Sequence, residues 1–531
     1  MPARVIVLGL DAAETSLLNR WAAEGHLPTI ARLSRSGRAY SLGNSLETLP
    51  GAIWPEITTG ISCGKKPLYY HPRQLHTGEA RVRPIRPEEI DPHDFFWSAV
   101  SAAGHRVAVV DPVQAVPVPN FNGIQLFEWG LHDRTFEIAS KPPELLGELR
   151  GRHGDHPINS CDRHRCTESG YERLLDGLLA GAERKTRLLL DLLARETWDL
   201  FVGTYSESHC VGHQFWHFLD LRHPWHDPAA PAKLRNAIRS VYAAIDSGLA
   251  EVIEAAGPNA VVLIIASHGM GPNTGGPQLL PEVLVRLGLG SSPGTGASWV
   301  RRLKRTLSYA PRPLQPVLRE VADIKLLKHL QARSGALIDP LESPATRAVA
   351  LRNNRCGAIR LNLKGREPFG RVCPGDEQQS LVGELREELL ALKDPTSGEP
   401  IVTAVKTAID AFGPEHHQDV PDLMVLFRGD LGLLESCTSP RTGLVQVPVF
   451  HPDMPRSGEH TPNSCLWVSG LGIQSGQATQ KAHVLDIAPT VLHALNVPVP
   501  EGLTGHTLFN ERRAAEMRSP QGGSPNEWSA R

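Results

Sequence analysis

Three histidines that recur at four-residue intervals are the residues of this chain with the clearest capacity for chemistry. His209, His213 and His217 follow a short apolar run that is typical of a strand. Residues four apart lie on the same face of a helix, so His209 and His213 could bind one metal ion. The alternative is a histidine-rich helix exposed to solvent, because His223 and His226 follow closely. The spacing alone leaves both interpretations open.

Apolar runs and helical patterns alternate through the first half of the chain and must position these side chains. Strands are predicted at 5–10, 105–111, 198–204 and 260–266, and helices at 16–23, 28–36, 171–196 and 234–256. Continuous apolar strands separated by helices are typical of a parallel sheet that is buried on both faces. We therefore predict an α/β fold in three layers, with a mostly parallel central sheet and helices on both of its faces.

Candidate ligands follow the carboxyl ends of these strands. Asp11 ends the first strand, and Glu207 follows the third. Ser267 and His268 follow the fourth. In a parallel sheet, the loops beyond the carboxyl ends of the strands meet at one edge. The sequence therefore predicts a metal site at this edge, although Asp11 could instead only cap a helix.

The second half of the chain returns to alternating strands and helices after a region rich in Pro, Gly and Ser. We predict a first part of the α/β core at 1–289, an inserted basic, proline-rich lid or linker at 290–345, a second part of the core with smaller insertions at 346–510, and a disordered tail at 511–531. The basic insertion could also face a membrane surface or a partner, but its prolines favour a solvated segment.

Composition and charge narrow the class of protein. With 531 residues, 41% of them hydrophobic, the chain can bury a large core. A formal net charge of -2 gives no reason to expect binding to nucleic acid polymers. The eight cysteines are scattered without a paired framework, which favours a reduced, intracellular protein.

The N-terminal apolar run is short and reaches Asp11 at once, so it is predicted to be a strand and not a signal peptide. No segment approaches the roughly 20 apolar residues that are needed to cross a bilayer. A cytoplasmic protein without a transmembrane segment is therefore expected. The sequence carries no signal for an oligomeric state.

Phosphoryl transfer requires positive charge on the phosphoryl oxygens, a nucleophile held in line and usually two cations a few ångströms apart. Ligands for such cations must come from several loops at once. The chain offers a carboxylate, a hydroxyl and four imidazoles in suitable places: Asp11, Thr48, His209, His213, His268 and His460. These residue types favour a small phosphorylated substrate, although His460 could instead be an ordinary loop histidine.

Several stretches, in this order along the chain, carry a family resemblance. They are Val5–Asp11, Thr48–Trp54 with Thr59–Gly60, Gly212–Trp216, Ser267–Met270, Gly458–His460 and Asp486–Thr490, supported by Asn362–Gly370 and Pro421–Leu423. In this set the chain resembles the alkaline phosphatase superfamily, specifically its type I phosphodiesterase/nucleotide pyrophosphatase and phosphohydrolase/phosphomutase-like branch. The resemblance implies an alkaline-phosphatase-like three-layer sandwich with inserted lid segments.

The resemblance also implies a set of metal ligands. Asp11 and His268 would bind one divalent metal together with a hydroxyl nucleophile, and His213 and His460 would bind the other. His209 stands where the family usually has Asp. Three imidazoles still suit zinc, since they leave one position for water or substrate. The expected cofactor is one or two divalent ions, zinc or alternatively manganese.

A second departure from the family is Ser267, which stands where the family has the Asp of its Asp-His-Gly-Met motif. A neutral serine hydroxyl is a weak ligand where a carboxylate would neutralise the second cation. The second metal is therefore expected to be weakly bound or absent. Glu207 is a candidate replacement for the missing carboxylate.

The third departure concerns the nucleophile. Aligned without gaps, the hydroxyl position of the family falls on Pro50, which has no hydroxyl. A loop two residues longer brings Thr48 to this position, and Ser45 is a weaker candidate. Asn44 could donate to a phosphate oxygen. The alternative role for Thr48 is a helix N-cap, and Trp54 is expected to be a packing residue.

These expectations combine into a metal-dependent hydrolase of phosphate esters, either diesters, including nucleotide-type pyrophosphates, or monoesters. Thr48 would attack phosphorus to form a phospho-enzyme, which water then hydrolyses. One alternative is a phosphoryl transferase or mutase, in which another alcohol accepts the group. Another is a catalytically degenerate member of the fold that binds a metal or ligand, since a fold does not by itself imply activity.

Overall fold

The structure is a computed structural model that describes residues 4–67, 85–130, 136–163, 167–290, 346–351, 353, 355–447, 456–470, 472–478 and 482–509. These residues form two compact units. Unit 1 comprises the described parts of 4–67, 85–274 and 456–509, and unit 2 those of 275–290 and 346–447. Nearly all of the predicted insertion at 290–345 and the whole predicted tail at 511–531 lie outside the described residues.

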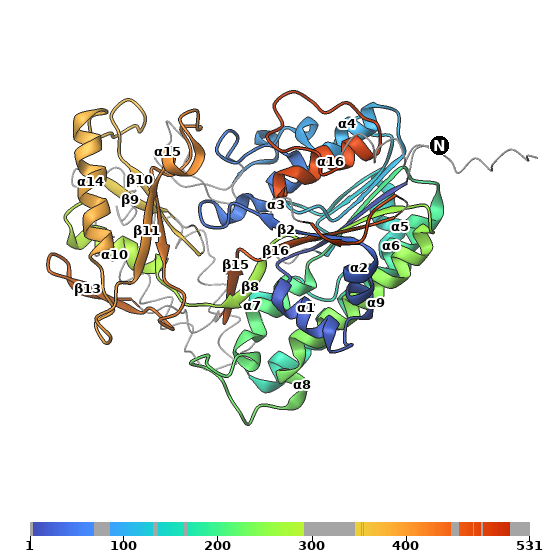
Figure 1. Cartoon of the computed structure of the whole chain (residues 1–531), viewed down its shortest axis with the longest axis horizontal. Helices are drawn as coiled ribbons and strands as arrows, with labels where there is room; N and C mark the ends of the chain where they lie inside the picture. The colour runs from blue at the N-terminus through green and yellow to red at the C-terminus, as the bar shows by residue number, and fades with distance from the viewer. Residues whose placement is uncertain are drawn as a thin grey trace, which may run out of the picture. The chain divides into compact units, whose positions relative to one another are not determined.

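A ten-stranded sheet runs through unit 1 (Figure 1). In spatial order its strands are β17 (Gly476–Gln477), β2 (Arg38–Gly43), β16 (Ser464–Ser469), β7 (Val261–Ala266), β1 (Val5–Leu10), β6 (Leu200–Tyr205), β3 (Val107–Val110), β4 (Gly123–Phe127) and β5 (Ala139–Lys141), and β18 (Ala482–His483) also pairs with β2. Strand β1 is parallel to both of its neighbours, with Val5 opposite Leu200 and Val261. Strand β16 is antiparallel to β7 and β2, and β5 is antiparallel to β4. The predicted mostly parallel central sheet is confirmed.

Successive side chains of β1 belong to two hydrophobic cores, one on each face of the sheet. Ile6, Leu8 and Leu10 belong to one core, and Val5 and Val7 to the other. Because both faces are buried, the strand is a continuous apolar run.

Two helical layers cover these faces (Figure 1). The helices that pack on the Ile6 face are α1 (Thr15–Ala23), α2 (Pro28–Ser36), α5 (Glu144–His153), α6 (Glu168–Arg195), α7 (Glu207–Leu219), α8 (Ala232–Arg235) and α9 (Ala237–Ala256). Those on the Val5 face are α3 (Ile53–Thr59), α4 (Phe96–Ala102) and α16 (Ile487–Ala494). The prediction of three layers is confirmed.

The longest helix, α6, shows why the chain is helical here. Thr167 caps its N-terminus, its side chain accepting a hydrogen bond from the Gly170 backbone amide. Leu174, Leu178 and Leu192 recur at helical spacing and are buried in the core. The apolar stripe therefore fixes which side of α6 faces the sheet.

A short antiparallel pair in unit 1, which we call the β8–β15 ribbon, joins two distant segments of the chain. Strand β8 (Gly269–Pro272) follows β7 directly, and β15 (Gly458–Thr461) precedes β16. In this ribbon His460 lies opposite Met270. The ribbon therefore brings the candidate ligands His268 and His460 close together.

Unit 2 is built on a separate, four-stranded antiparallel sheet. Its strands, in spatial order, are β11 (Val402–Thr407), β12 (Leu423–Phe427), β10 (Gly357–Leu361) and β9 (Ala348–Leu351). The other elements of unit 2 are α10 (Leu280–Arg286), α14 (Asp376–Leu390), α15 (Ala408–Phe412) and the hairpin of β13 (Ser436–Ser439) and β14 (Gly443–Gln446). Ile359, Leu284 and Leu385 meet in its hydrophobic core. The stretch 346–447, expected as part of the α/β core, thus has a core of its own.

The stretch Asn362–Gly370, one of the supporting matches, contributes to a buried charge network in unit 2. The fully buried Arg360 donates from Nε to Glu367 Oε1 at 2.7 Å. Arg366 donates to both carboxylate oxygens of Asp422, at 2.9 and 2.7 Å. These pairs hold β10 and the residue before β12 together, so the stretch has a structural role.

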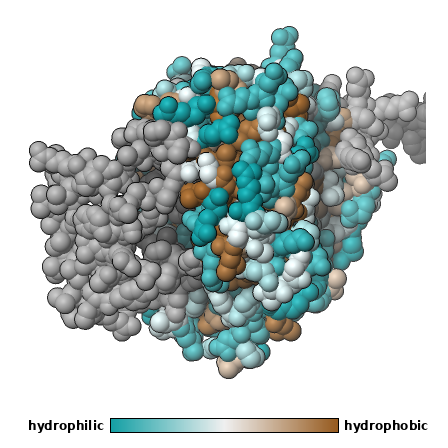
Figure 2. All heavy atoms as spheres, turned by 90° about the vertical axis from the view of Figure 1, so that its left-hand side faces the viewer, coloured by the Kyte–Doolittle hydropathy of each residue, from teal (hydrophilic) through white to brown (hydrophobic). Residues whose placement is uncertain are grey.

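Short 3-10 helices complete the described elements. They are η1 (Pro50–Ala52), η2 (Pro87–Glu89), η3 (Pro92–Asp94), η4 (Cys161–Arg163), η5 (Pro277–Leu279) and η7 (Val484–Asp486). No helix in the described part of the chain combines the length and apolar content needed to cross a membrane. On the face drawn in Figure 2, hydrophilic side chains surround the patches of hydrophobic ones.

Candidate active site

Helix α7 positions two of the candidate ligands. It begins at Glu207, directly after β6 at the carboxyl edge of the parallel strands. His209 and His213 lie one turn apart on it, and their side chains are 1% and 0% exposed. His217 is also buried. The alternative of a solvated histidine-rich helix is therefore wrong for these three residues.

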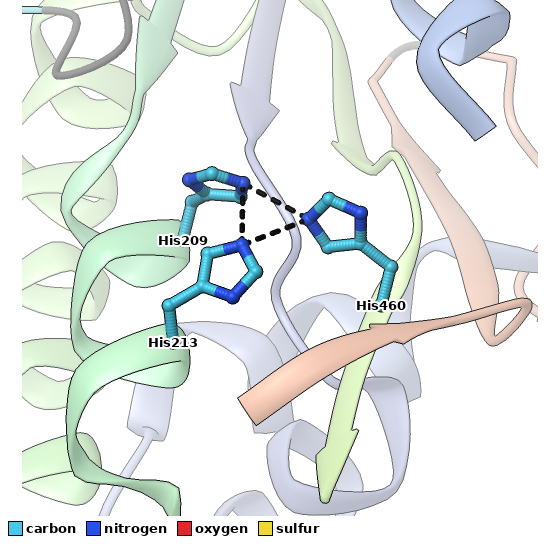
Figure 3. A group of neighbouring side chains, drawn as sticks. All are labelled: His209, His213 and His460. Carbon is cyan, nitrogen blue, oxygen red and sulfur yellow. Dashed lines mark hydrogen bonds between the residues drawn. The ribbon is translucent and has the colours of Figure 1, made fainter. Parts of the chain in front are cut away.

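His460 of the β8–β15 ribbon completes a cluster of three imidazoles (Figure 3). The Nε2 atom of His209 lies 2.9 Å from that of His460 and 3.1 Å from that of His213. The third side of the triangle, from His213 to His460, is 3.2 Å. Among the described residues, this is the one group of three or more His, Cys, Asp or Glu side chains close enough to share a metal ion.

The geometry of the three Nε2 atoms suits a cation better than hydrogen bonds. An imidazole Nε2 either carries a hydrogen or presents a lone pair. Among three atoms at least two are of the same kind, so the three contacts cannot all be hydrogen bonds. Around a tetrahedral zinc ion, ligand nitrogens about 2.0–2.1 Å from the metal lie about 3.3 Å from one another. The observed triangle is close to this size.

A backbone contact orients one of the rings. His213 Nδ1 lies 2.7 Å from the Gly458 carbonyl oxygen, to which an Nδ1 hydrogen can donate. A neutral His213 then presents the lone pair of Nε2 to the cluster, the arrangement that metal-binding histidines commonly have. Gly458 is required here because an added Cβ would lie 2.2 Å from the Gly212 carbonyl oxygen.

His268 lies beside the cluster, its ring centroid 4.4 Å from that of His460. Its Nδ1 lies 3.0 Å from Ser267 Oγ, and its Nε2 is buried without a hydrogen-bond partner. Burial lowers the pKa of His268 well below its usual range, and the charge of His460 lowers it further. His268 is therefore a neutral imidazole with one nitrogen available for a cation or a substrate oxygen.

Asp11 is held by a residue that the sequence interpretation placed among packing residues. Trp54 Nε1 donates to Asp11 Oδ1 at 2.7 Å. The Trp54 ring crosses Gly9, where an added Cβ would lie 2.4 Å from the ring. A glycine inside an otherwise apolar strand is the signal that could have indicated this close approach. On the other side, Ser208 Oγ donates to the Asp11 carbonyl oxygen at 2.7 Å.

The candidate nucleophile lies in a turn before η1. Thr48 is half-buried, and its Oγ1 donates to the Ser45 carbonyl oxygen at 3.0 Å. The N-cap of η1 is Leu49, so the alternative that Thr48 is an N-cap is wrong. Both polar groups of Asn44 have partners in the protein: Oδ1 accepts from the Leu46 amide in the same loop, and Nδ2 donates to the Pro462 carbonyl oxygen between β15 and β16.

Glu207, the candidate replacement carboxylate, pairs with His156 and is not a member of the histidine cluster. Its Oε1 lies 3.0 Å from His156 Nε2, and both side chains are buried. Burial raises the pKa of Glu207, but the hydrogen bond and charge of His156 and the charge of Lys185 outweigh this, so the pKa is lowered overall. The carboxylate is therefore a hydrogen-bond partner of His156 and is outside the three-histidine group.

The mostly parallel sheet between helical layers is also found in solved structures. The fold is similar to that of the alkaline phosphatase PafA, with a TM-score of 0.54 and 13% identity over 96% of this chain and 98% of that one. Looser matches are the phosphonoacetate hydrolase from Sinorhizobium meliloti 1021 (TM-score 0.47, 14% identity, 93% and 96% covered) and the murine ectonucleotide pyrophosphatase/phosphodiesterase 5 (TM-score 0.44, 10% identity, 94% and 96% covered).

The sequence profile of the type I phosphodiesterase/nucleotide pyrophosphatase family matches residues 5–440. The chain belongs to this family and is a phosphoric ester hydrolase. The resemblance inferred from the motifs is confirmed. No curated protein matches the chain.

Proposed function

We propose that this protein is a metal-dependent hydrolase of small phosphate esters that works through a phospho-enzyme, with a zinc ion held by His209, His213 and His460. The observation that carries the proposal is the buried triangle of three Nε2 atoms, 2.9 to 3.2 Å apart. Three imidazoles and an open fourth position favour zinc over manganese, which prefers oxygen ligands. When bound, the ion would act as a Lewis acid toward a phosphoryl oxygen.

Asp11 and His268 are the proposed ligands of a second, weaker cation. The unpartnered Nε2 of His268 and its neutral state support this role. Ser267 supplies no negative charge at this position, and its hydroxyl already contacts His268 Nδ1 at 3.0 Å. We therefore expect one tightly bound ion and a second that is lost easily.

Thr48 is the proposed nucleophile. Its Oγ forms a bond to phosphorus as the bond from phosphorus to the ester oxygen breaks, and the leaving alcohol takes up a proton. Water then cleaves the bond between Oγ and phosphorus and regenerates the hydroxyl. The hydrogen bond from Thr48 to the Ser45 carbonyl oxygen fixes the hydroxyl within its turn before the reaction.

We also propose that the segment 290–345 is an inserted lid or linker and that the protein is cytoplasmic. Both are predictions from the amino-acid sequence. Cell fractionation of the tagged full chain would show a membrane or exported fraction if the predicted location is wrong.

The test of the proposed function is elemental analysis of protein purified without chelator, combined with hydrolysis of a mono-aryl and a bis-aryl phosphate. Bound zinc with turnover is the expected result, and the preferred ester separates a phosphatase from a diesterase. Removal of a direct ligand, His209→Ala, should weaken zinc binding by more than the about 10- to 100-fold typical of outer partners. His217→Gln is the matched control, because His217 is buried on the same helix and contacts Ser457.

The neutral Ser267 favours a second candidate, a member of the fold that retains one ion and has lost turnover. This candidate predicts at most one equivalent of zinc and no hydrolysis of either ester, even with added zinc or manganese. Turnover of either ester by the wild type, lost in His209→Ala, excludes it.

A further inference from the structure

Glu14 is a buried carboxylate close to the site that none of the proposed steps uses. Its side chain is 3% exposed, and it occupies the N-cap of α1. Oε1 accepts from the Ser16 amide at 3.1 Å and from Asn463 Nδ2 at 2.8 Å. Oε2 accepts from the Met270 amide at 3.1 Å and from Thr461 Oγ1 at 2.7 Å.

The bond to Ser16 is all that a helix N-cap requires. The bonds to Met270 and Thr461 do something else, because they reach both strands of the β8–β15 ribbon. Met270 lies opposite His460 in this ribbon, and Thr461 follows His460 in sequence. One carboxylate oxygen therefore joins β15, which carries His460, to β8, which His268 directly precedes.

The ribbon is shaped to admit this carboxylate. A Cβ added at Gly269 would lie 2.1 Å from Glu14 Oε2 and 2.3 Å from Thr461 Oγ1. A glycine at this position therefore leaves room for the carboxylate between the strands. On the opposite side, the Glu14 backbone amide donates to the Tyr242 hydroxyl of α9 at 2.9 Å. The loop after β1 is thus fixed to the helical layer as well as to the ribbon.

We propose that Glu14 is a positioning residue that sets His268 and His460 relative to Asp11, an inference that rests on the proposed metal site. A two-stranded ribbon is marginally stable by itself. Glu14 ties it to the loop that begins at Asp11. Metal sites are sensitive to such support, since loss of an outer partner typically weakens metal binding about 10- to 100-fold.

The variant that tests this inference is Glu14→Gln. The substitution replaces one carboxylate oxygen by an NH₂ group. Each carboxylate oxygen accepts two hydrogen bonds, so in either orientation of the amide the NH₂ group lies where two donors need an acceptor, and it cannot accept from them. The matched control is Asp246→Asn, because Asp246 is also buried and accepts from the backbone amides of Thr29 and Ile30. These amides belong to α2, so the control removes buried hydrogen bonds at α2 and not at the β8–β15 ribbon.

The measurement is the zinc dissociation constant of the metal-free full chain, by competition with a chromogenic chelator, together with urea unfolding. Glu14→Gln should weaken zinc binding at least about tenfold. Asp246→Asn should lower stability and leave zinc binding unchanged. Equal loss of stability in both variants with unchanged zinc binding in both would show that Glu14 is only a helix cap, and it overturns the inference.

A second variant covers the case in which Glu14→Gln does not fold. Thr461→Val removes one donor to Glu14 Oε2 and keeps the side-chain shape, so it should weaken zinc binding by a smaller factor. Where Glu14→Gln does fold, the effects of the two changes in the double variant should be less than additive, because both remove the same hydrogen bond. If the wild type binds zinc and neither change alters its affinity, the inference about Glu14 is overturned but the proposed function is not. A wild type without zinc affinity overturns the proposed function and this inference with it.

Discussion

Trp54 and Asp11 are joined by a 2.7 Å hydrogen bond from the indole nitrogen to a carboxylate oxygen. Asp11 follows the central strand β1, and Trp54 belongs to α3, which follows the turn that holds Thr48. The bond therefore ties the proposed nucleophile loop to a proposed metal ligand. It also fixes one oxygen of Asp11, so the direction of the carboxylate is set before any ion binds.

Replacement of Trp54 by Phe keeps a ring over Gly9 and removes the hydrogen-bond donor. We expect Trp54→Phe to lower kcat/KM about 10- to 100-fold, the usual effect of losing an outer partner of a ligand. Trp216→Phe is the matched control, because the Trp216 Nε1 is buried without a hydrogen-bond partner. Steady-state kinetics with the better aryl ester compares the two. Equal activity in both variants would show that the Trp54 hydrogen bond does not contribute to turnover.

Thr48→Ala should abolish the covalent intermediate and with it most of the turnover, because no hydroxyl remains at the proposed position. Thr48→Ser keeps a hydroxyl and should retain measurable activity. Mass spectrometry of acid-quenched protein after mixing with substrate reports the added phosphoryl group. Ser45→Ala is the control, because Ser45 is the weaker candidate for the nucleophile; this variant should still form the covalent intermediate. If Thr48→Ala turns over at the wild-type rate, the covalent step does not involve Thr48.

Ser267→Asp introduces the carboxylate that the family resemblance implies at this position. Ser267 is fully buried, so an unpaired carboxylate there should destabilise the metal-free protein by several kcal/mol. A second bound cation would compensate this charge. We therefore expect a larger rise in Tm on adding zinc for Ser267→Asp than for the wild type, together with a second equivalent of metal by elemental analysis. A variant with one equivalent and an unchanged metal response would argue against a second site at this position.

Glu56, on α3, predicts a specific dependence of stability on pH. Burial raises the pKa of its carboxyl, and hydrogen bonds from Cys63 and Ser45 and the charge of His483 offset this only in part. At pH values between the ordinary pKa of 4.5 and the raised pKa of the folded state, the folded state binds more protons than the unfolded state. The free energy of unfolding therefore falls as pH rises through this window.

Glu56→Gln removes this titration, so the stability of the variant should improve relative to the wild type as pH rises from about 4.5. Urea unfolding of metal-free protein at several pH values measures the difference. If the difference in unfolding free energy between the variant and the wild type stays constant with pH, the Glu56 carboxyl has the same pKa in the folded and unfolded states.

Much of the fold was predictable from the sequence because it is encoded locally. The continuous apolar run at 5–10 predicts a strand buried on both faces, and the structure places Ile6 and Val7 in opposite cores. Strand β2 was missed, because its sequence of mixed polar and apolar residues lacks this signal. Edge and antiparallel strands depend on which partners they find, and local periodicity does not record this.

In the candidate site, too, some features follow from local sequence and others only from tertiary contacts. The four-residue spacing of His209 and His213 determines by itself that both side chains share one face of α7. Only the tertiary structure decided that His460 meets them, because the antiparallel pairing of β15 with β8 sets its place. It also decided that Glu207 pairs with His156 and that Trp54 binds Asp11. Such contacts join residues far apart in sequence, so they depend on the order of strands and on packing, which no local pattern contains.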